Sequence, residues 1–199
     1  MILETSLKKN KRSGEMSTTS EAPTKGEVEV SIVTVDGPEM ISTGGGAIKI
    51  TAGGIRINTY ENEAEISWSG WAPEFVGDFL ALDLPALLEI GQQLYTGAIE
   101  RDHTVDYLLE GHRSYFVFEP VSEETVRVAF QTRDQIDSSL AVPDPTPRSE
   151  RGYVVNTEEL CQSLLQCAQE FQQQATAFGV ARDGLSDQIS EVESVLTTT

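Results

Sequence analysis

The sequence is short of cysteine and contains no long apolar run. No stretch approaches the roughly 18 to 20 consecutive apolar residues that a membrane-spanning helix needs, and no apolar segment follows the basic residues near the N-terminus, as it would in a signal peptide. We therefore expect a cytoplasmic protein without a membrane association. Cys161 and Cys167 lie six residues apart in one predicted helix, on different sides of it. This spacing argues against a disulfide between them and predicts two small packing residues.

Basic residues are scarce beyond the first 27 positions. Residues 1–27 carry five Lys/Arg and four Glu, whereas residues 28–199 carry nine basic against 28 acidic side chains. After Lys25 the only lysine is Lys49. Such an excess opposes folding through self-repulsion, which acts over about 10 Å in dilute salt and about 3 Å in molar salt. The composition resembles that of proteins from halophiles with high internal salt. Two alternatives stay open: an acidic protein from a source with ordinary internal salt, or an acidic surface that engages a basic partner or mimics nucleic acid.

The scarcity of basic residues also disfavours direct binding of nucleic acid, because neutralising phosphates requires clustered Lys and Arg. The basic stretch at residues 8–12 is the exception. It is either a phosphate-seeking arm or an upstream extension of a chain that starts at Met16.

Length and composition predict one folded domain with tails. A chain of 199 residues suffices for one sizeable core, and 39% hydrophobic with 23% charged residues is typical of globular proteins. We expect a disordered N-terminal tail at 1–27 and a single domain at 28–179, with a proline-rich loop at 133–151. A C-terminal segment at 180–199 should contain a short amphipathic helix.

Alternating apolar residues predict strands in the first half of the chain. Two alternating segments flank the connector at residues 51–54, which predicts a hairpin. The predicted strands of this half are residues 28–32, 48–50, 55–57 and 64–68. A helix should follow, with Asp83 as its N-cap, Pro85 in its first turn and its end near Gly97, after a short extended piece at residues 79–82.

The second half predicts a three-stranded meander, at residues 105–109, 115–118 and 126–130, and then the longest helix. Asn156 as N-cap with Glu159 three residues later forms a capping box, and Val155 with Leu160 a hydrophobic staple. Gly179 should end this helix. The last apolar residues at helical spacing, which include Leu185, Ile189 and Val192, predict either a docked terminal helix or a helix that binds a partner.

These elements predict an α+β fold. We expect a mostly antiparallel sheet of six or seven strands, with the two main helices packed on one face and the short C-terminal helix in addition. Residues on the other face of the sheet should meet water.

No recognisable catalytic, cofactor or metal motif is present, and we predict none of these sites. The glycines at residues 44–46 and 53–54 are not followed by Lys-Ser/Thr or by a helix, so they predict turns and not a phosphate loop. His103 and His112 have no nearby ligand pair for zinc, and no nucleophile motif accompanies them. Acidic residues are too abundant for any pair of them to indicate acid–base chemistry.

An interaction surface is the leading functional hypothesis. Trp68, Trp71 and Phe75 cluster in sequence near the first helix, where they either close the core or form a binding surface. We predict a non-catalytic protein-interaction or regulatory domain that binds a protein partner or itself, through this cluster or the C-terminal helices. One alternative is a small-molecule-binding or enzymatic domain with a pocket between sheet and helices. Another is a nucleic-acid mimic, with carboxylates in rows.

Overall fold

The computed structural model describes residues 28–33, 41, 44–57, 80–101, 103–109, 114–132, 152–180 and 182–198. Within these ranges the chain forms, in order, β1 (Val28–Val33), β2 (Ala47–Ala52), β3 (Ile55–Arg56), α2 (Leu80–Tyr95), β4 (Val105–Leu108), β5 (Ser114–Pro120), β6 (Thr125–Thr132), β7 (Tyr153–Asn156), α4 (Thr157–Ala177) and α5 (Asp183–Thr197). The fold is therefore α+β, as the sequence predicts.

The strands form two antiparallel sheets, with the orders β1-β2-β3 and β4-β5-β6-β7. The prediction of a single sheet of six or seven strands is wrong. Among the described residues, the strands that follow α2 form a separate meander of sequential neighbours. The predicted hairpin is confirmed, because β2 pairs with β3 across Gly53 and Gly54. The strand predicted at 64–68 and the loop predicted at 133–151 lie outside the described residues.

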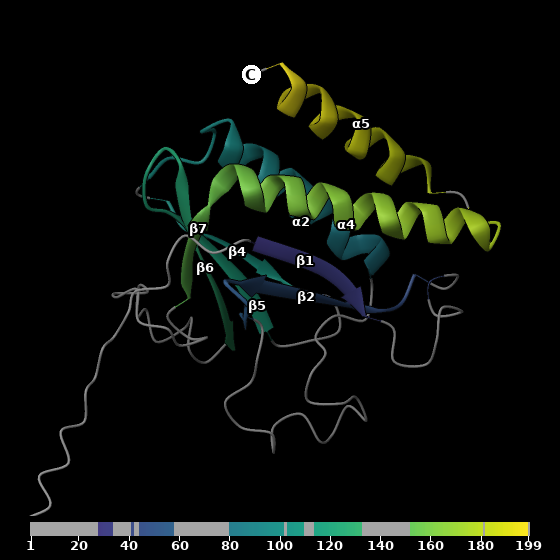
Figure 1. The fold of residues 1–199 in the computed structure, drawn as a ribbon, viewed down its shortest axis with the longest axis horizontal. Coiled ribbons are helices and arrows are strands. Elements are labelled where there is room, and N and C mark those ends of the chain that lie inside the picture. The colour runs from purple at the N-terminus through teal and green to yellow at the C-terminus, as the bar shows by residue number, and fades with distance from the viewer. Residues whose placement is uncertain are drawn as a thin grey trace, which may run out of the picture.

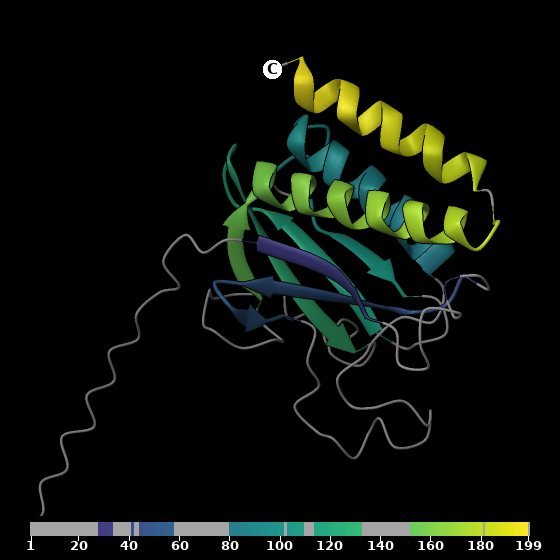
Figure 2. The ribbon, with the colours of Figure 1, turned by 45° about the vertical axis from the view of Figure 1, so that its right-hand side comes forward.

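The elements stack in three layers (Figures 1 and 2). Helices α2 and α4 lie side by side, and both sheets lie on the same side of this pair. Helix α5 packs across α2 and α4 on the side that faces away from the sheets. The expected covering of one side by the two main helices is thus observed, and α5 is the docked terminal helix.

One hydrophobic core joins these layers. Its buried residues come from both sheets and from α2, α4 and α5. On the four-stranded sheet, Phe116 packs against Phe118 and Phe130 with ring centroids 6.3 and 5.5 Å apart. The opposite face of this sheet carries a second cluster, in which Val117 and Ala129 are buried. The expectation that this face meets water is wrong at these two positions.

Helix α2 begins four residues earlier than predicted. The residues from Leu80 onward are helical, so the extended piece expected at 79–82 is not observed there. Leu80 precedes Leu84 by four residues and is fully buried, which extends the apolar face of the helix to its first residue. Asp83 is therefore not the N-cap. It lies in the first turn, is fully buried, and its Oδ1 accepts a hydrogen bond of 2.8 Å from the Tyr107 hydroxyl.

Helix α4 begins and ends where the sequence predicts. The backbone N–H of Glu159 donates to Oδ1 of Asn156 over 3.0 Å, so Asn156 is the N-cap. Gly179 follows the C-cap residue, with a φ of +75°. Strand β7 directly before this helix is missing from the sequence prediction, because four residues give too short an alternation to recognise. It pairs with β6, and its Tyr153 and Val155 are buried.

Candidate functional site

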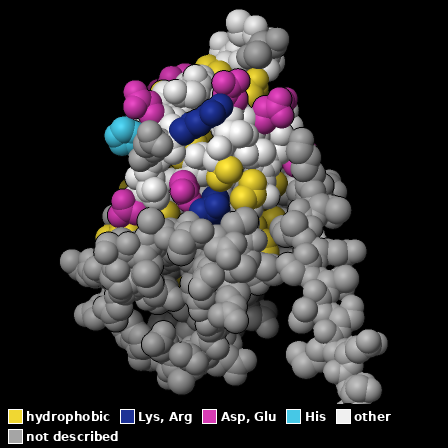
Figure 3. All heavy atoms as spheres, turned by 90° about the vertical axis from the view of Figure 1, so that its left-hand side faces the viewer, with side chains coloured by type: hydrophobic (Ala, Val, Ile, Leu, Met, Phe, Trp, Pro, Cys, Tyr) yellow, Lys and Arg dark blue, Asp and Glu magenta, His cyan; other side chains and the backbone are white. Residues whose placement is uncertain are grey.

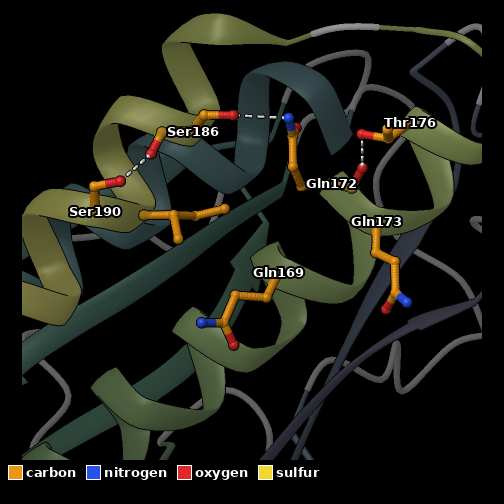
Figure 4. Close-up of a pocket in the computed structure, with 7 residues that line it drawn as sticks. Gln169, Gln172, Gln173, Thr176, Ser186 and Ser190 are labelled. Carbon is orange, nitrogen blue, oxygen red and sulfur yellow. Dashed lines mark hydrogen bonds between the residues drawn. The ribbon is translucent and has the colours of Figure 1, made fainter.

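A groove runs between α4 and α5 (Figure 4), and we call it the α4–α5 groove. It has a volume of about 400 Å³. Its lining residues are Gln169, Gln172, Gln173 and Thr176 from α4, with Ser186, Ile189 and Ser190 from α5. None of these lining residues is charged, although the chain has a net charge of −18. The apolar part of the groove is Ile189, which is 8% exposed.

Hydrogen bonds fix most of the polar groups in this groove. Gln172 and Ser186 point toward each other, and the amide Nε2 of Gln172 donates to the Ser186 hydroxyl over 2.8 Å (Figure 4). The hydroxyls of Thr176 and Ser190 donate to backbone carbonyls one turn earlier in their own helices. The Gln172 Oε1 atom is different. It is buried and accepts no hydrogen bond from any of the described residues.

A second groove lies between β1 and α4, and we call it the β1–α4 groove. It has a volume of about 510 Å³. Its lining residues are Val28, Glu29, Val30 and Ser31 from β1, Thr51 and Gly54 from the β2–β3 hairpin, and Ser163, Gln166 and Glu170 from α4. The Ser163 hydroxyl donates to the carbonyl oxygen of Val28 over 2.7 Å, which fastens α4 to the start of β1. This groove is the kind of sheet–helix pocket that a ligand-binding domain would need.

The chain was compared with models of protein families, with curated proteins and with solved structures. None of the three comparisons finds a match. Function is therefore inferred from the chemistry of the two grooves.

The predicted interface residues fall into two groups. Trp68, Trp71 and Phe75 lie outside the described residues, so the tryptophan cluster stays a prediction. Leu185, Ile189 and Val192 lie on α5 and are 3%, 8% and 0% exposed, because α5 packs on α2 and α4. Of these three, only Ile189 lines a groove. The apolar face of α5 therefore serves the core, and the surface that α5 leaves open is polar.

The polar residues of the α4–α5 groove were not predicted from sequence as a site. A usable signal was present, however. Gln169, Gln172 and Gln173 are closely spaced uncharged residues on the polar side of a helix, in a chain with more than twice as many acidic as basic residues.

His103 belongs to no metal-binding cluster among the described residues. His103 is exposed, and its Nδ1 lies 3.7 Å from a carboxylate oxygen of Glu100. His112 lies outside the described residues. The part of the chain that the structure describes holds no group of three His, Cys, Asp or Glu side chains placed to bind a metal. It also holds no helix with the length and apolar character needed to cross a membrane.

Both cysteines are buried thiols without a disulfide, as predicted. Burial, and to a smaller extent the nearby Glu158 and Glu170 carboxylates, raise the pKa of Cys161 to about 11 and that of Cys167 to about 12, from 9.0. The thiolate is the reactive form of cysteine, so both side chains are poor nucleophiles near neutral pH.

Thiol labelling tests this directly. In the folded protein at pH 8 we expect reaction with a thiol reagent such as DTNB to be slow at both sites, and to become fast and stoichiometric in urea. The pKa of each thiol is higher in the folded protein than in the unfolded chain. The contribution of the two thiols to the free energy of unfolding is therefore fully present below about pH 9 and is lost as the pH rises toward 11 to 12. Rapid labelling of the folded chain would contradict the buried placement.

Proposed function

We propose that this protein is a non-catalytic interaction domain that self-associates through the α4–α5 groove. The observation that carries the proposal is that none of the seven residues lining this groove is charged, in a chain with a net charge of −18. The exposed amide of Gln173 offers both a donor and an acceptor to a docked partner. The groove therefore favours a partner that presents uncharged hydrogen-bonding groups.

The charge of the chain favours a second copy as that partner. Two copies, each with a net charge of −18, repel each other wherever their acidic surfaces meet. None of the residues that line the α4–α5 groove is charged, and the Glu193 carboxylate beside them is bonded to the Gln169 amide. The exposed Gln173 amide is both a donor and an acceptor, so the same groove can face itself across a two-fold axis, with each copy supplying an N–H group to the other.

The length of α4 also supports this surface. Helix α4 has 21 residues and so extends over about 31 Å, long enough to present a continuous contact surface.

The acidic surface is better explained by salt adaptation than by mimicry of nucleic acid. On the face shown in Figure 3, the acidic side chains are scattered singly among uncharged and basic ones, whereas mimicry requires rows. Scattered carboxylates suit a protein that works in concentrated salt, where their mutual repulsion is screened. We accordingly propose molar KCl as the condition in which self-association is strongest.

Replacing Gln173 with Glu should weaken self-association. The substitution puts a carboxylate into the groove of each copy and removes an N–H donor from each, so two hydrogen bonds are lost per dimer. At about 0.5 to 1.5 kcal/mol per bond, we expect the dimer dissociation constant to rise about 5- to 150-fold. Sedimentation equilibrium in 2 M KCl over a range of protein concentrations measures this constant.

Gln174→Glu is the matched control. Gln174 is the next residue of α4, is exposed and does not line the groove, so its substitution changes the net charge equally and should leave the dissociation constant nearly unchanged. A wild-type protein that stays monomeric at every concentration, or equal weakening by both substitutions, would overturn the proposed interface.

A further inference from the structure

We propose that the β1–α4 groove binds the basic segment of this chain's own N-terminal tail, residues 8–12. The tail enters the described fold at Val28, which is itself a lining residue of the groove. A segment that leads directly into β1 therefore starts beside the site that it would occupy.

The chemistry of the groove selects a cationic occupant. Its charged lining residues are Glu29 from β1 and Glu170 from α4, and both are exposed. The neighbouring Gln166 donates its amide N–H to Glu170 Oε1 over 3.1 Å, which holds this carboxylate in place. Two carboxylates on opposite walls, among hydroxyls and an amide, suit ammonium and guanidinium groups better than an apolar ligand.

The tail is the part of the chain richest in those groups. It holds five of the 14 basic residues, four of them within residues 8–12, and its net charge is +1. The remainder of the chain has a net charge of −19. The basic segment of the tail and the two glutamates of the groove therefore carry opposite charges.

Tethering makes a weak attraction effective. An exposed ion pair contributes only about 0 to 1 kcal/mol, so a few such pairs would hold a separate peptide poorly. The 15 residues between Arg12 and Val28 span at most about 50 Å, which is ample for reaching along the groove. A linker of this kind keeps the segment at a local concentration on the order of millimolar.

Salt should control the occupancy of the groove. Screening shortens the range of these attractions from about 10 Å at 0.1 M to about 3 Å at 1 M salt. We infer that the tail occupies the groove in dilute salt and leaves it in molar salt. The groove would thus be unoccupied in molar salt, where the repulsion between copies of the acidic domain is weakest.

Paramagnetic relaxation enhancement on the full chain tests this placement. A nitroxide on Ser13→Cys marks the tail, and the buried native thiols should not compete for the label at neutral pH. At 0.1 M salt we expect the amide signals of Glu29, Gln166 and Glu170 to lose most of their intensity, while those of β4 keep theirs. In 2 M KCl the loss should disappear.

Substitutions in the groove separate specific docking from diffuse attraction. Glu29→Gln with Glu170→Gln should restore the lost intensity at 0.1 M salt. The control pair Glu100→Gln with Glu124→Gln changes the net charge equally at exposed sites outside the groove and should restore nothing. An even loss over the whole surface, or equal effects of both pairs, would overturn the proposal.

Mixed samples identify the source of the bound tail. One sample mixes ¹⁵N-labelled protein that carries no spin label with spin-labelled protein that carries no ¹⁵N. If the tail docks within its own chain, the ¹⁵N signals of the groove keep their intensity in this mixture. Broadening of those signals would show that the tail of a second copy occupies the groove, which would overturn the intramolecular assignment.

Discussion

Replacing Phe171 with alanine is expected to lower the free energy of unfolding by about 3 to 5 kcal/mol. Phe171 lies near the middle of α4, is fully buried and belongs to the core shared by both sheets and all three described helices. Its ring also carries the guanidinium of Arg182, whose Cζ lies 5.6 Å from the ring centroid. The substitution therefore leaves a cavity and removes a cation–π contact.

Phe178→Ala is the matched control for this prediction. It removes the same side chain from the C-cap of the same helix, but Phe178 is 43% exposed, so the loss should stay within about 1 kcal/mol. Urea unfolding at fixed KCl compares the variants, because guanidinium chloride would change the ionic strength as it denatures. Similar losses for both variants would contradict the core assignment of Phe171.

Replacing Phe171 should destabilise the packing of α5 more than that of the sheets. Arg182 is the N-cap residue of α5, and its Nε is buried without a partner among the described residues. The contact with Phe171 thus links the N-cap of α5 to α4. Hydrogen exchange of Phe171→Leu, a milder variant, should show faster exchange in α5 than in β5.

Elements with strong local signals could be predicted from the sequence. The cap of α4 follows from Asn156 and Glu159, and its end from Gly179, because the groups that determine them lie within a few residues of each other. The separation into two sheets could not be predicted. It depends on which strand β4 pairs with, and alternation along a strand carries no information about its neighbour.

The start of α2 shows the same limit. Asp83 has the residue type of an N-cap, yet it is buried and bonded to Tyr107 of β4, 24 positions away. Tertiary contact, and not local capping, decides its role. The α4–α5 groove also depends on tertiary contact, since Gln172 meets Ser186 only when α5 folds back on α4.

Glutamine replaces lysine as the donor between helices in this lysine-poor chain. The amide Nε2 of Gln92 on α2 donates to Glu191 Oε1 of α5 over 3.0 Å, and that of Gln169 on α4 donates to Glu193 Oε1 over 2.6 Å. A neutral amide bonded to a carboxylate is less dependent on ionic screening than a pair of opposite charges. The docking of α5 should therefore persist in molar salt, where the proposed self-association is measured.

Gly152→Ala is expected to be the most damaging glycine-to-alanine change among the glycines that the structure describes. Gly152 directly precedes β7 and has a φ of +74°, a conformation that costs an L-residue about 1 to 2 kcal/mol. An added Cβ would also lie 2.8 Å from Ala129 Cβ and closer still to the carbonyl oxygen of Val128. Because both neighbours belong to β6, the methyl group can fit only if β7 moves away from its partner strand.

Gly179→Ala separates the two contributions. Gly179 has nearly the same φ, +75°, but no atom outside its immediate chain neighbours lies within 4 Å of an added Cβ. It should therefore show the conformational cost alone, whereas Gly152→Ala adds an overpacking cost of about 1 to 3 kcal/mol. Urea unfolding at fixed KCl measures the difference, and amide exchange in β7 locates it. Equal losses of unfolding free energy would mean that β7 moves away from β6 at little cost, which would contradict the overpacking expected at Gly152.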